Sequence, residues 1–204
     1  MSTLVMPGED AHAMVNKAER LENREGLPEA LAVLLAEYPR EAWKADPGFS
    51  GLIRFWLDRH LMFRRLLAMM TASAEATAGG KIDPLRLAAE LTRLGSMFAR
   101  ELHGHHMIEN HHYFPRLRRL DARIEHGFDL LDADHRDLDA HLGSFTCDAN
   151  AVIEAARADT SQEAAIDRFL KGLAGTGRFL DRHLSDEEDL IVPVLLKHGA
   201  SGIR

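Results

Sequence analysis

The feature that most constrains this chain is a motif that occurs twice, a histidine followed four residues later by a glutamate and six residues after that by a proline. The motif residues are His105, Glu109 and Pro115 in the first copy, and His183, Glu187 and Pro193 in the second. Residues four apart lie on one face of an α-helix, so each copy directs one imidazole and one carboxylate toward the same spot. The sequence therefore predicts two helices that present potential metal ligands.

Two further histidines stand at matching distances before the two copies of the motif. His60 precedes His105 by 45 residues, and His135 precedes His183 by 48 residues. The offset between the two lone histidines is 75 residues, and the offset between the two motifs is 78 residues. Nearly equal offsets predict a duplicated helical hairpin with a small difference in length.

Four long stretches carry apolar residues at alternating spacings of three and four, which is typical of amphipathic helices. The expected helices run from about Gly48 to between Thr71 and Gly80, from Asp83 to Pro115, from Gly127 to about Arg157, and from Ser161 past Leu190. The sequence contains no strand pattern. Four helices of about 20 to 30 residues with short connections predict an all-α fold, an antiparallel up-down-up-down four-helix bundle.

Residues 1–45 precede this pattern, and we expect them to form an N-terminal arm on a bundle made by residues 46–204. Within the arm, Pro28 precedes the apolar run 31–35 and Pro39 stops it, which predicts one short helix at most. His12 lies outside this run, and we interpret it as a solvent-exposed residue rather than a ligand.

Composition disfavours several functions and compartments. A net charge of −7 and a pI of about 5.9 do not suit a nucleic-acid surface, which needs clustered lysine and arginine. The single cysteine, Cys147, excludes an intramolecular disulfide and any cysteine-rich zinc or iron–sulfur site. No stretch approaches the roughly 20 apolar residues that span a membrane, and the N-terminus lacks the pattern of a signal peptide. We therefore expect a cytoplasmic protein.

The predicted core faces carry a histidine on all four helices and a glutamate on two of them. One buried histidine alone is usually a satisfied hydrogen-bonding residue, but six such residues together favour a metal site: His60, His105, Glu109, His135, His183 and Glu187. Burying unpaired carboxylates is costly, and bound cations offset that cost. Imidazole and carboxylate ligands suit iron, manganese or zinc. Two facing glutamates can also bridge two cations about 3.5–4 Å apart, with a water-derived oxo or hydroxo group as a third bridge.

Over about residues 50 to 197 these motifs resemble the hemerythrin-like, or HHE cation-binding, family. The closing dipeptides Phe114-Pro115 and Val192-Pro193 are also similar to those of the family. The resemblance implies a four-helix bundle around a non-haem centre of two Fe ions bridged by oxo or hydroxo. It assigns His60 and His105 to one iron, His135 and His183 to the other, and Glu109 and Glu187 to bridging positions.

One departure from the family pattern concerns the third helix. Oxygen-carrying hemerythrins have a second histidine one turn after the third-helix histidine, and this chain has Asp139 there. We expect Asp139 to face the same cavity as the metals. His141 lies six residues after His135, about 120° around the helix, and is not expected to substitute.

Other polar residues near the motifs receive less specific interpretations. His112 shares the apolar stripe and is expected to support the ligands, whereas surface or helix-side positions are expected for His103, His106 and His111. The acidic residues Asp186, Glu188 and Asp189 indicate a solvated face, with Glu188 as an alternative to Glu187 if the helix is distorted.

Three uses of the predicted metal site remain open. The leading hypothesis is a di-iron protein that binds or reacts with oxygen, peroxide or nitric oxide, as a carrier or as an enzyme. The second is a regulator, iron sensor or iron store without turnover, in which the arm contacts a protein partner or a second copy of the chain. The third is a structural zinc or manganese site. Nucleic acid and membrane are not expected partners.

Overall fold

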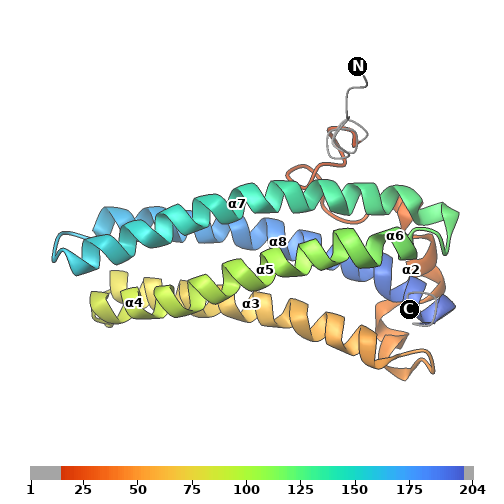
Figure 1. Ribbon diagram of the computed structural model, residues 1–204, viewed down its shortest axis with the longest axis horizontal. Helices are drawn as coiled ribbons and strands as arrows, with labels where there is room; N and C mark the ends of the chain where they lie inside the picture. Colours follow the sequence, from red (N-terminus) through yellow and green to blue (C-terminus); the bar gives the residue numbers. More distant parts are fainter. Residues whose placement is uncertain (1–14, 200–204) are drawn as a thin grey trace, which may run out of the picture. The chain divides into compact units, whose positions relative to one another are not determined.

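The computed structural model describes residues 15–199, and within this range the chain is helical and contains no strand (Figure 1). The longer helices are α3 (Gly51–Ala78), α5 (Ser96–Ile108), α7 (Glu125–Arg157) and α8 (Glu163–His198), with the shorter α2 (Val33–Glu37), α4 (Pro84–Glu90) and α6 (Phe114–Leu117). The predicted all-α helical bundle is confirmed. His12 lies outside the described residues.

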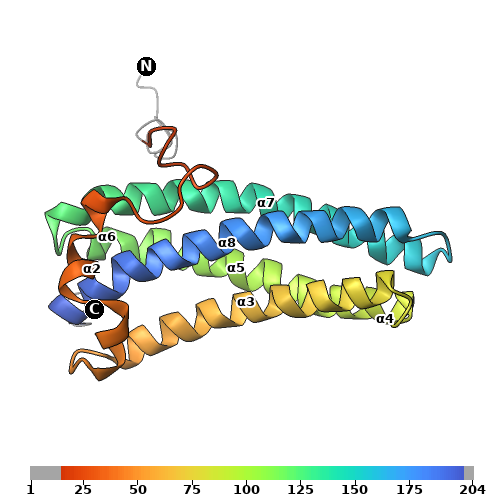
Figure 2. The same ribbon diagram turned by 180° about the vertical axis from the view of Figure 1, so that it is seen from behind.

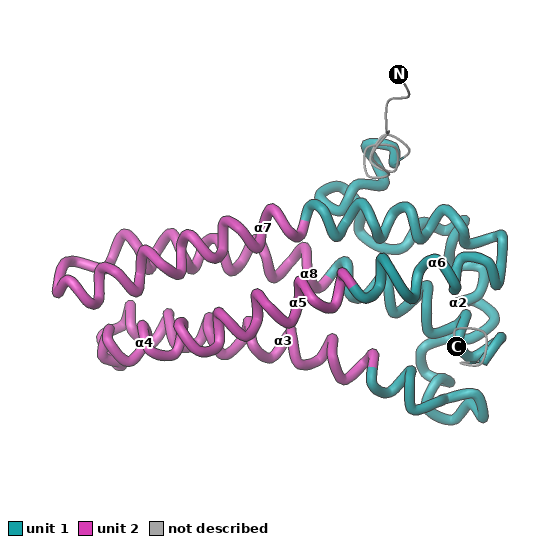
Figure 3. The backbone as a smooth tube through the Cα atoms, in the orientation of Figure 1, with its two compact units in different colours: residues 1–55, 108–137, 182–204 teal, residues 56–107, 138–181 magenta. Residues whose placement is uncertain are grey.

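The chain divides into two compact units, and the long helices run from one unit into the other (Figure 3). Within the described residues, unit 1 comprises residues 15–55, 108–137 and 182–199, and unit 2 comprises residues 56–107 and 138–181. Thus α7 contributes its first part to unit 1 and its second part to unit 2, and α8 does the reverse.

Unit 2 is held together by a row of phenylalanines, one from each of its four long helical segments. Successive ring centroids are 6.3 Å apart from Phe63 of α3 to Phe98 of α5, 5.4 Å from Phe98 to Phe145 of α7, and 5.8 Å from Phe145 to Phe169 of α8. Fully burying one such side chain contributes about 1.5–3 kcal/mol. The row therefore ties all four segments of this unit into one core.

The connecting turns of unit 2 lie at the same end of that unit, so α3 with α4 and α7 with α8 form two hairpins (Figures 1 and 2). Asp83 caps α4 by accepting hydrogen bonds from the backbone N–H groups of Leu85 and Arg86, and Pro84 occupies the first turn. The predicted start of this helix is confirmed. Gly80 supplies the positive φ of 69° that the preceding turn needs.

The second predicted helix contains two π-helical turns, η3 (Leu91–Gly95) and η4 (Glu109–Tyr113), which separate α4, α5 and α6. The second of these turns precedes Pro115, whose ring would clash with a carbonyl one turn earlier in a regular α-helix. The wider π-turn relieves that clash. Pro115 therefore lies in the first turn of α6, a further short helix, and η4 shifts the residues after Glu109 around the axis.

In unit 1 the N-terminal segment consists of η1 (Glu29–Leu31), α2 and η2 (Arg40–Ala45). The predicted short helix is present and ends at Glu37, before Pro39. Its apolar residues Leu34 and Trp43 are buried, and Trp43 Nε1 donates a 2.7 Å hydrogen bond to the backbone oxygen of Tyr38. This segment therefore packs as part of unit 1.

The first part of α7 and the last part of α8 approach each other closely in unit 1. A Cβ placed on Gly127 of α7 would lie 2.7 Å from Leu190 Cδ2 of α8, so glycine permits this approach. No helix within residues 15–199 is both long enough and apolar enough to cross a lipid bilayer.

Candidate metal centre

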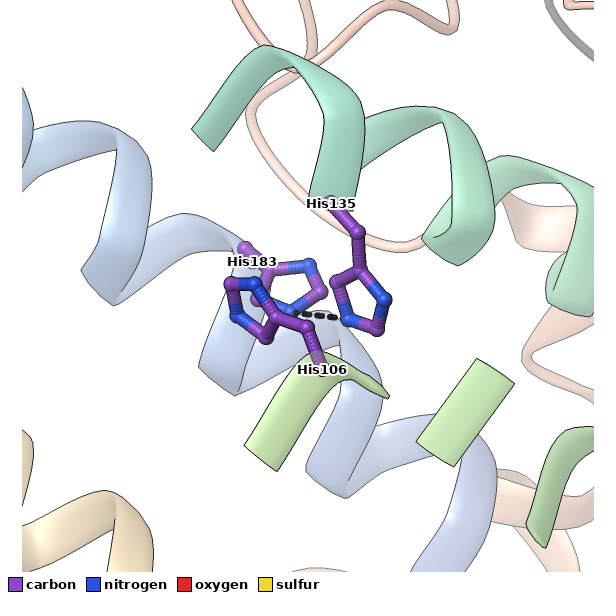
Figure 4. A group of neighbouring side chains, drawn as sticks. All are labelled: His106, His135 and His183. Carbon is purple, nitrogen blue, oxygen red and sulfur yellow. Dashed lines mark hydrogen bonds between the residues drawn. The ribbon is translucent and has the colours of Figure 1, made fainter. Parts of the chain in front are cut away.

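In unit 1, His135 of α7 and His183 of α8 direct their Nε2 atoms at each other over 3.2 Å (Figure 4). Their ring centroids are 4.8 Å apart and the rings meet edge to face at 70°. Both residues are almost completely buried. The two predicted ligands are therefore next to each other, away from bulk water.

The opposite nitrogen of each ring has its own acceptor. His135 Nδ1 lies 2.8 Å from Asn110 Oδ1, and His183 Nδ1 lies 3.2 Å from Asp134 Oδ2. Because these oxygens accept, each Nδ1 carries a proton and each Nε2 is the nitrogen available to a metal. Phe114 also stacks on His135, with centroids 5.4 Å apart and planes inclined by 21°. Both rings are thus held in orientation.

Two buried carboxylates adjoin these imidazoles within unit 1. Glu109 Oε2 lies 3.5 Å from His135 Nε2, and Glu187 Oε2 lies 3.4 Å from His183 Nε2. Burial raises the pKa of Glu109 well above its ordinary value, and the charge of Glu187 and a hydrogen bond with it raise that pKa further. Two negative charges are unfavourable here without a compensating cation.

The same environment attracts positive charge to His183. Burial lowers the pKa of His183, but hydrogen bonds to Asp134 and Glu187 and the charges of both outweigh that effect and raise it to about 9. With both Nδ1 atoms donating, two neutral rings would bring lone pairs together at Nε2. A proton or a metal ion removes that repulsion, so the donor set fits a cation.

Unit 2 contains a matching pair of histidines. His60 Nε2 of α3 lies 3.2 Å from His105 Nε2 of α5, and the ring centroids are 5.2 Å apart with planes inclined by 81°. His60 is fully buried, and the Phe63 and Trp56 rings lie 5.3 Å and 6.2 Å from the His105 ring. The pair repeats the geometry seen in unit 1, as expected for a duplicated sequence, and the aromatic rings limit its contact with water.

All six sequence-predicted ligands lie on helices or helical turns, and the structure groups them within the two units. Unit 2 brings His60 and His105 together, and unit 1 brings together Glu109, His135, His183 and Glu187. Their assignment to one dinuclear centre stays a prediction.

The expectation that Asp139 faces the metals is wrong. Asp139 is exposed, with Oδ1 3.4 Å from Nδ1 of His103, which is exposed as predicted. The buried stripe of α7 continues from His135 through Leu138 and Leu142, which leaves position 139 at its edge. His141 packs against Phe179, with ring centroids 4.4 Å apart.

Two interpretations of the histidines near the first motif are also wrong. His112 is exposed, and Asn110 is the residue that contacts His135. The π-turn that begins at Glu109 rotates the following residues away from the stripe that regular periodicity predicts. His106, expected at a surface or helix-side position, is only 2% exposed.

The expected solvated face of α8 is buried. Asp186 is 0% exposed and Glu188 6% exposed, because the N-terminal segment covers them. Arg24 pairs with Asp186, and Arg40 pairs with Glu188 and Asp189. Sequence reasoning missed both arginines and the roles of Asn110 and Asp134. The only local signal was that Asp134 immediately precedes His135.

A cavity of about 350 Å³ in unit 1 reaches the neighbours of His135. Asn110 and Phe114, which both contact that histidine, line it together with Pro115, Arg118, Arg119, Phe128, Asp129 and Asp132. The cavity therefore adjoins the residues that hold this ring.

An all-α fold with buried histidine–glutamate clusters defines a metal-binding helical protein. The model of the hemerythrin HHE cation binding domain matches residues 51–196, and the chain therefore belongs to that family. The resemblance noted in the sequence is thereby confirmed. No curated protein and no solved structure matches the chain.

Proposed function

We propose that this protein binds two iron ions, bridged by an oxo or hydroxo group, and that the centre binds or reacts with oxygen or a related small oxidant such as peroxide or nitric oxide. The proposed ligands are His60, His105, Glu109, His135, His183 and Glu187. One observation carries the proposal: each unit contains a pair of imidazoles whose Nε2 atoms are 3.2 Å apart.

The chemistry of the donors favours iron. Four imidazole nitrogens and two carboxylates suit iron or manganese, and no cysteine is available as a softer ligand in the set. A structural zinc ion usually takes four ligands in a closed tetrahedron, whereas six donors with two carboxylates suit a bridged pair of metals. Two ferrous ions, two glutamates and one hydroxide leave only one positive charge in the buried site.

The residues of this chain would hold, orient and shield the metals. Asn110 and Asp134 fix the Nδ1 protons of the unit 1 histidines, and Phe114 keeps one ring in place. Trp56 and Phe63 shield the unit 2 pair. When bound, iron would supply electrons to a small oxidant. The cavity beside Asn110 adjoins two residues that contact His135.

The exposed position of Asp139 supports reaction rather than reversible carriage. Because position 139 is at the surface, His135 would be the ligand that α7 supplies to a metal, which would leave positions for solvent and oxidant. Stopped-flow mixing of the diferrous protein with oxygenated buffer should give rapid conversion to the diferric form. A spectrum that returns to the diferrous form when oxygen is removed would contradict this proposal.

A second function, a metal-dependent regulator that binds a protein partner, is favoured by the ion pairs of Arg24 and Arg40 with α8. These contacts link residues outside the family match to a helix that carries two proposed ligands. Metal-dependent protease sensitivity of residues 15–45, without oxidant turnover, would favour the regulator.

The free, exposed Cys147 suits the reducing cytoplasm, which we propose as the compartment.

A further inference from the structure

Arg24, from the N-terminal segment, is buried between two carboxylates of unit 1. Its Nε donates to Asp186 Oδ2 over 2.6 Å, its Nη1 donates to Asp134 Oδ1 over 2.8 Å, and its Nη2 pairs with Asp134 Oδ2. The side chains of Arg24, Asp134 and Asp186 are 3%, 2% and 0% exposed. Water therefore does not screen these three charges.

Asp134 connects this arginine to a proposed metal ligand. Its Oδ2 pairs with Arg24 and also accepts a hydrogen bond from His183 Nδ1 over 3.2 Å. A continuous chain of charge-assisted hydrogen bonds thus runs from residue 24 to the imidazole on α8. Its first member lies outside residues 51–196, the part of the chain that matches the family.

Backbone contacts hold the arginine at this position. Arg24 Nη1 also donates to the backbone oxygen of Glu19 over 3.0 Å, and Arg182 Nη1 donates to the backbone oxygen of Glu25 over 2.7 Å. The segment is therefore fixed on both sides of Arg24, which favours a defined orientation of its guanidinium over a loose surface ion pair.

We propose that Arg24 is a positioning residue for His183. The guanidinium binds both oxygens of Asp134 and so fixes the orientation of the carboxylate. The carboxylate in turn holds Nδ1 of His183, so that Nε2 on the other side of the ring is available to a metal. Arginine suits this role because its fork binds a carboxylate through two parallel bonds and stays charged when buried. This proposal rests on the proposed function only for the identity of the metal ion that His183 would bind.

The test compares Arg24→Met with Arg24→Lys and with a control, Arg40→Met. Arg40 also attaches the N-terminal segment to α8, but it pairs with Glu188 and Asp189 instead of Asp134. The first measurement is the NMR signal of the His183 Nδ1 proton in metal-free protein and its protection from solvent exchange. The second is cobalt(II) affinity, measured by competition with a chelator.

Arg24→Met should broaden or remove the protected Nδ1 signal and lower cobalt affinity by about 10–100-fold, the usual effect of losing a residue that orients a ligand. Arg24→Lys should recover part of both, because it keeps the charge but not the fork. Arg40→Met should keep the Nδ1 signal and change the cobalt affinity by less than about threefold, which is smaller than the loss expected for a residue that orients a ligand.

An unchanged His183 signal and unchanged cobalt affinity in Arg24→Met would overturn the proposal and make Arg24 a structural anchor only. If Arg24→Met does not fold, Arg24→Lys carries the same test, and wild-type values in that variant would overturn it equally. If the wild type binds neither cobalt nor iron, the proposed function fails, while the NMR comparison still decides whether Arg24 positions the ring.

Discussion

Asp134 Oδ2 accepts a hydrogen bond from His183 Nδ1 over 3.2 Å, and both side chains are almost completely buried. This contact joins a residue of α7 to a proposed ligand of α8 and leaves His183 Nε2 directed at His135. Arg24 pairs with the same carboxylate. The stability of unit 1 and the proposed metal binding therefore involve the same group of charges.

Removing that carboxylate should strongly destabilise the protein. Asp134→Ala would leave the buried Arg24 with one carboxylate fewer, and breaking a buried pair typically costs about 3–5 kcal/mol in the free energy of unfolding. Asp181→Ala is the matched control, because Asp181 pairs with Arg64 at the surface and its side chain is 67% exposed. That change should cost less than about 1 kcal/mol. Equal urea midpoints for the two variants would contradict the prediction.

The metal-free protein should lose stability as pH rises. The pKa of His183 in the folded chain is raised to about 9 from an ordinary value of 6.5, so its stabilising contribution is complete below about pH 6.5 and disappears as pH passes about 9. The raised pKa of Glu109 acts in the same direction from lower pH. Urea midpoints at pH 6, 7.5 and 9 should therefore decrease in that order, and His183→Gln should flatten the upper part of the trend. A midpoint that increases over this range would rule out the explanation.

Metal should reverse this dependence, because protons compete with metal for each histidine. The loaded protein is expected to retain metal at neutral and alkaline pH and to release it below about pH 6, near the ordinary pKa of histidine. Metal content after equilibration and desalting at several pH values measures the release. Full retention in strong acid, under reversible conditions, would exclude histidine ligation.

The core of unit 2 should tolerate little loss of volume at its phenylalanine row. Phe98 is fully buried and contacts the rings of Phe63 and Phe145, so Phe98→Ala should lower the free energy of unfolding by about 3–5 kcal/mol. Phe55 is 59% exposed, and Phe55→Ala serves as the control, with an expected change within about 0.5 kcal/mol. A loss for Phe98→Ala no larger than for the control would contradict the packing described.

Position 139 should be neutral for oxidation of the centre. Because Asp139 is exposed and lies near His103, Asp139→Ala and Asp139→His should both leave the rate of oxidation by oxygen within about threefold of wild type, as expected for surface substitutions. Stopped-flow absorbance of iron-loaded variants measures that rate. A large change in Asp139→His alone would mean that this position reaches the metals after all.

Sequence alone was sufficient for the features that repeat with a fixed period. The four long helices follow from apolar spacing, and the six proposed ligands follow from two motifs and two lone histidines at nearly equal offsets. The start of α4 was also predicted, because Asp83 as the N-cap and Pro84 in the first turn act on the helix within one turn of their own position.

Other features depend on contacts that no spacing rule describes. Arg24 and Arg40 form ion pairs with carboxylates more than 100 residues away in the sequence. The sequence therefore predicted a solvated acidic face around Glu188, which the structure shows to be buried. The positions of Asn110 and His112 were missed for another reason. The π-turn beginning at Glu109 changes the helical register by one residue, and regular periodicity does not predict such a turn.

The iron content of the purified chain tests the central claim most directly. Protein loaded with ferrous iron without oxygen, desalted and submitted to elemental analysis should contain two iron ions per chain. Glu109→Gln and Glu187→Gln should each lower that content, because each removes a proposed bridging carboxylate. At most one tightly bound iron per wild-type chain would contradict the dinuclear centre.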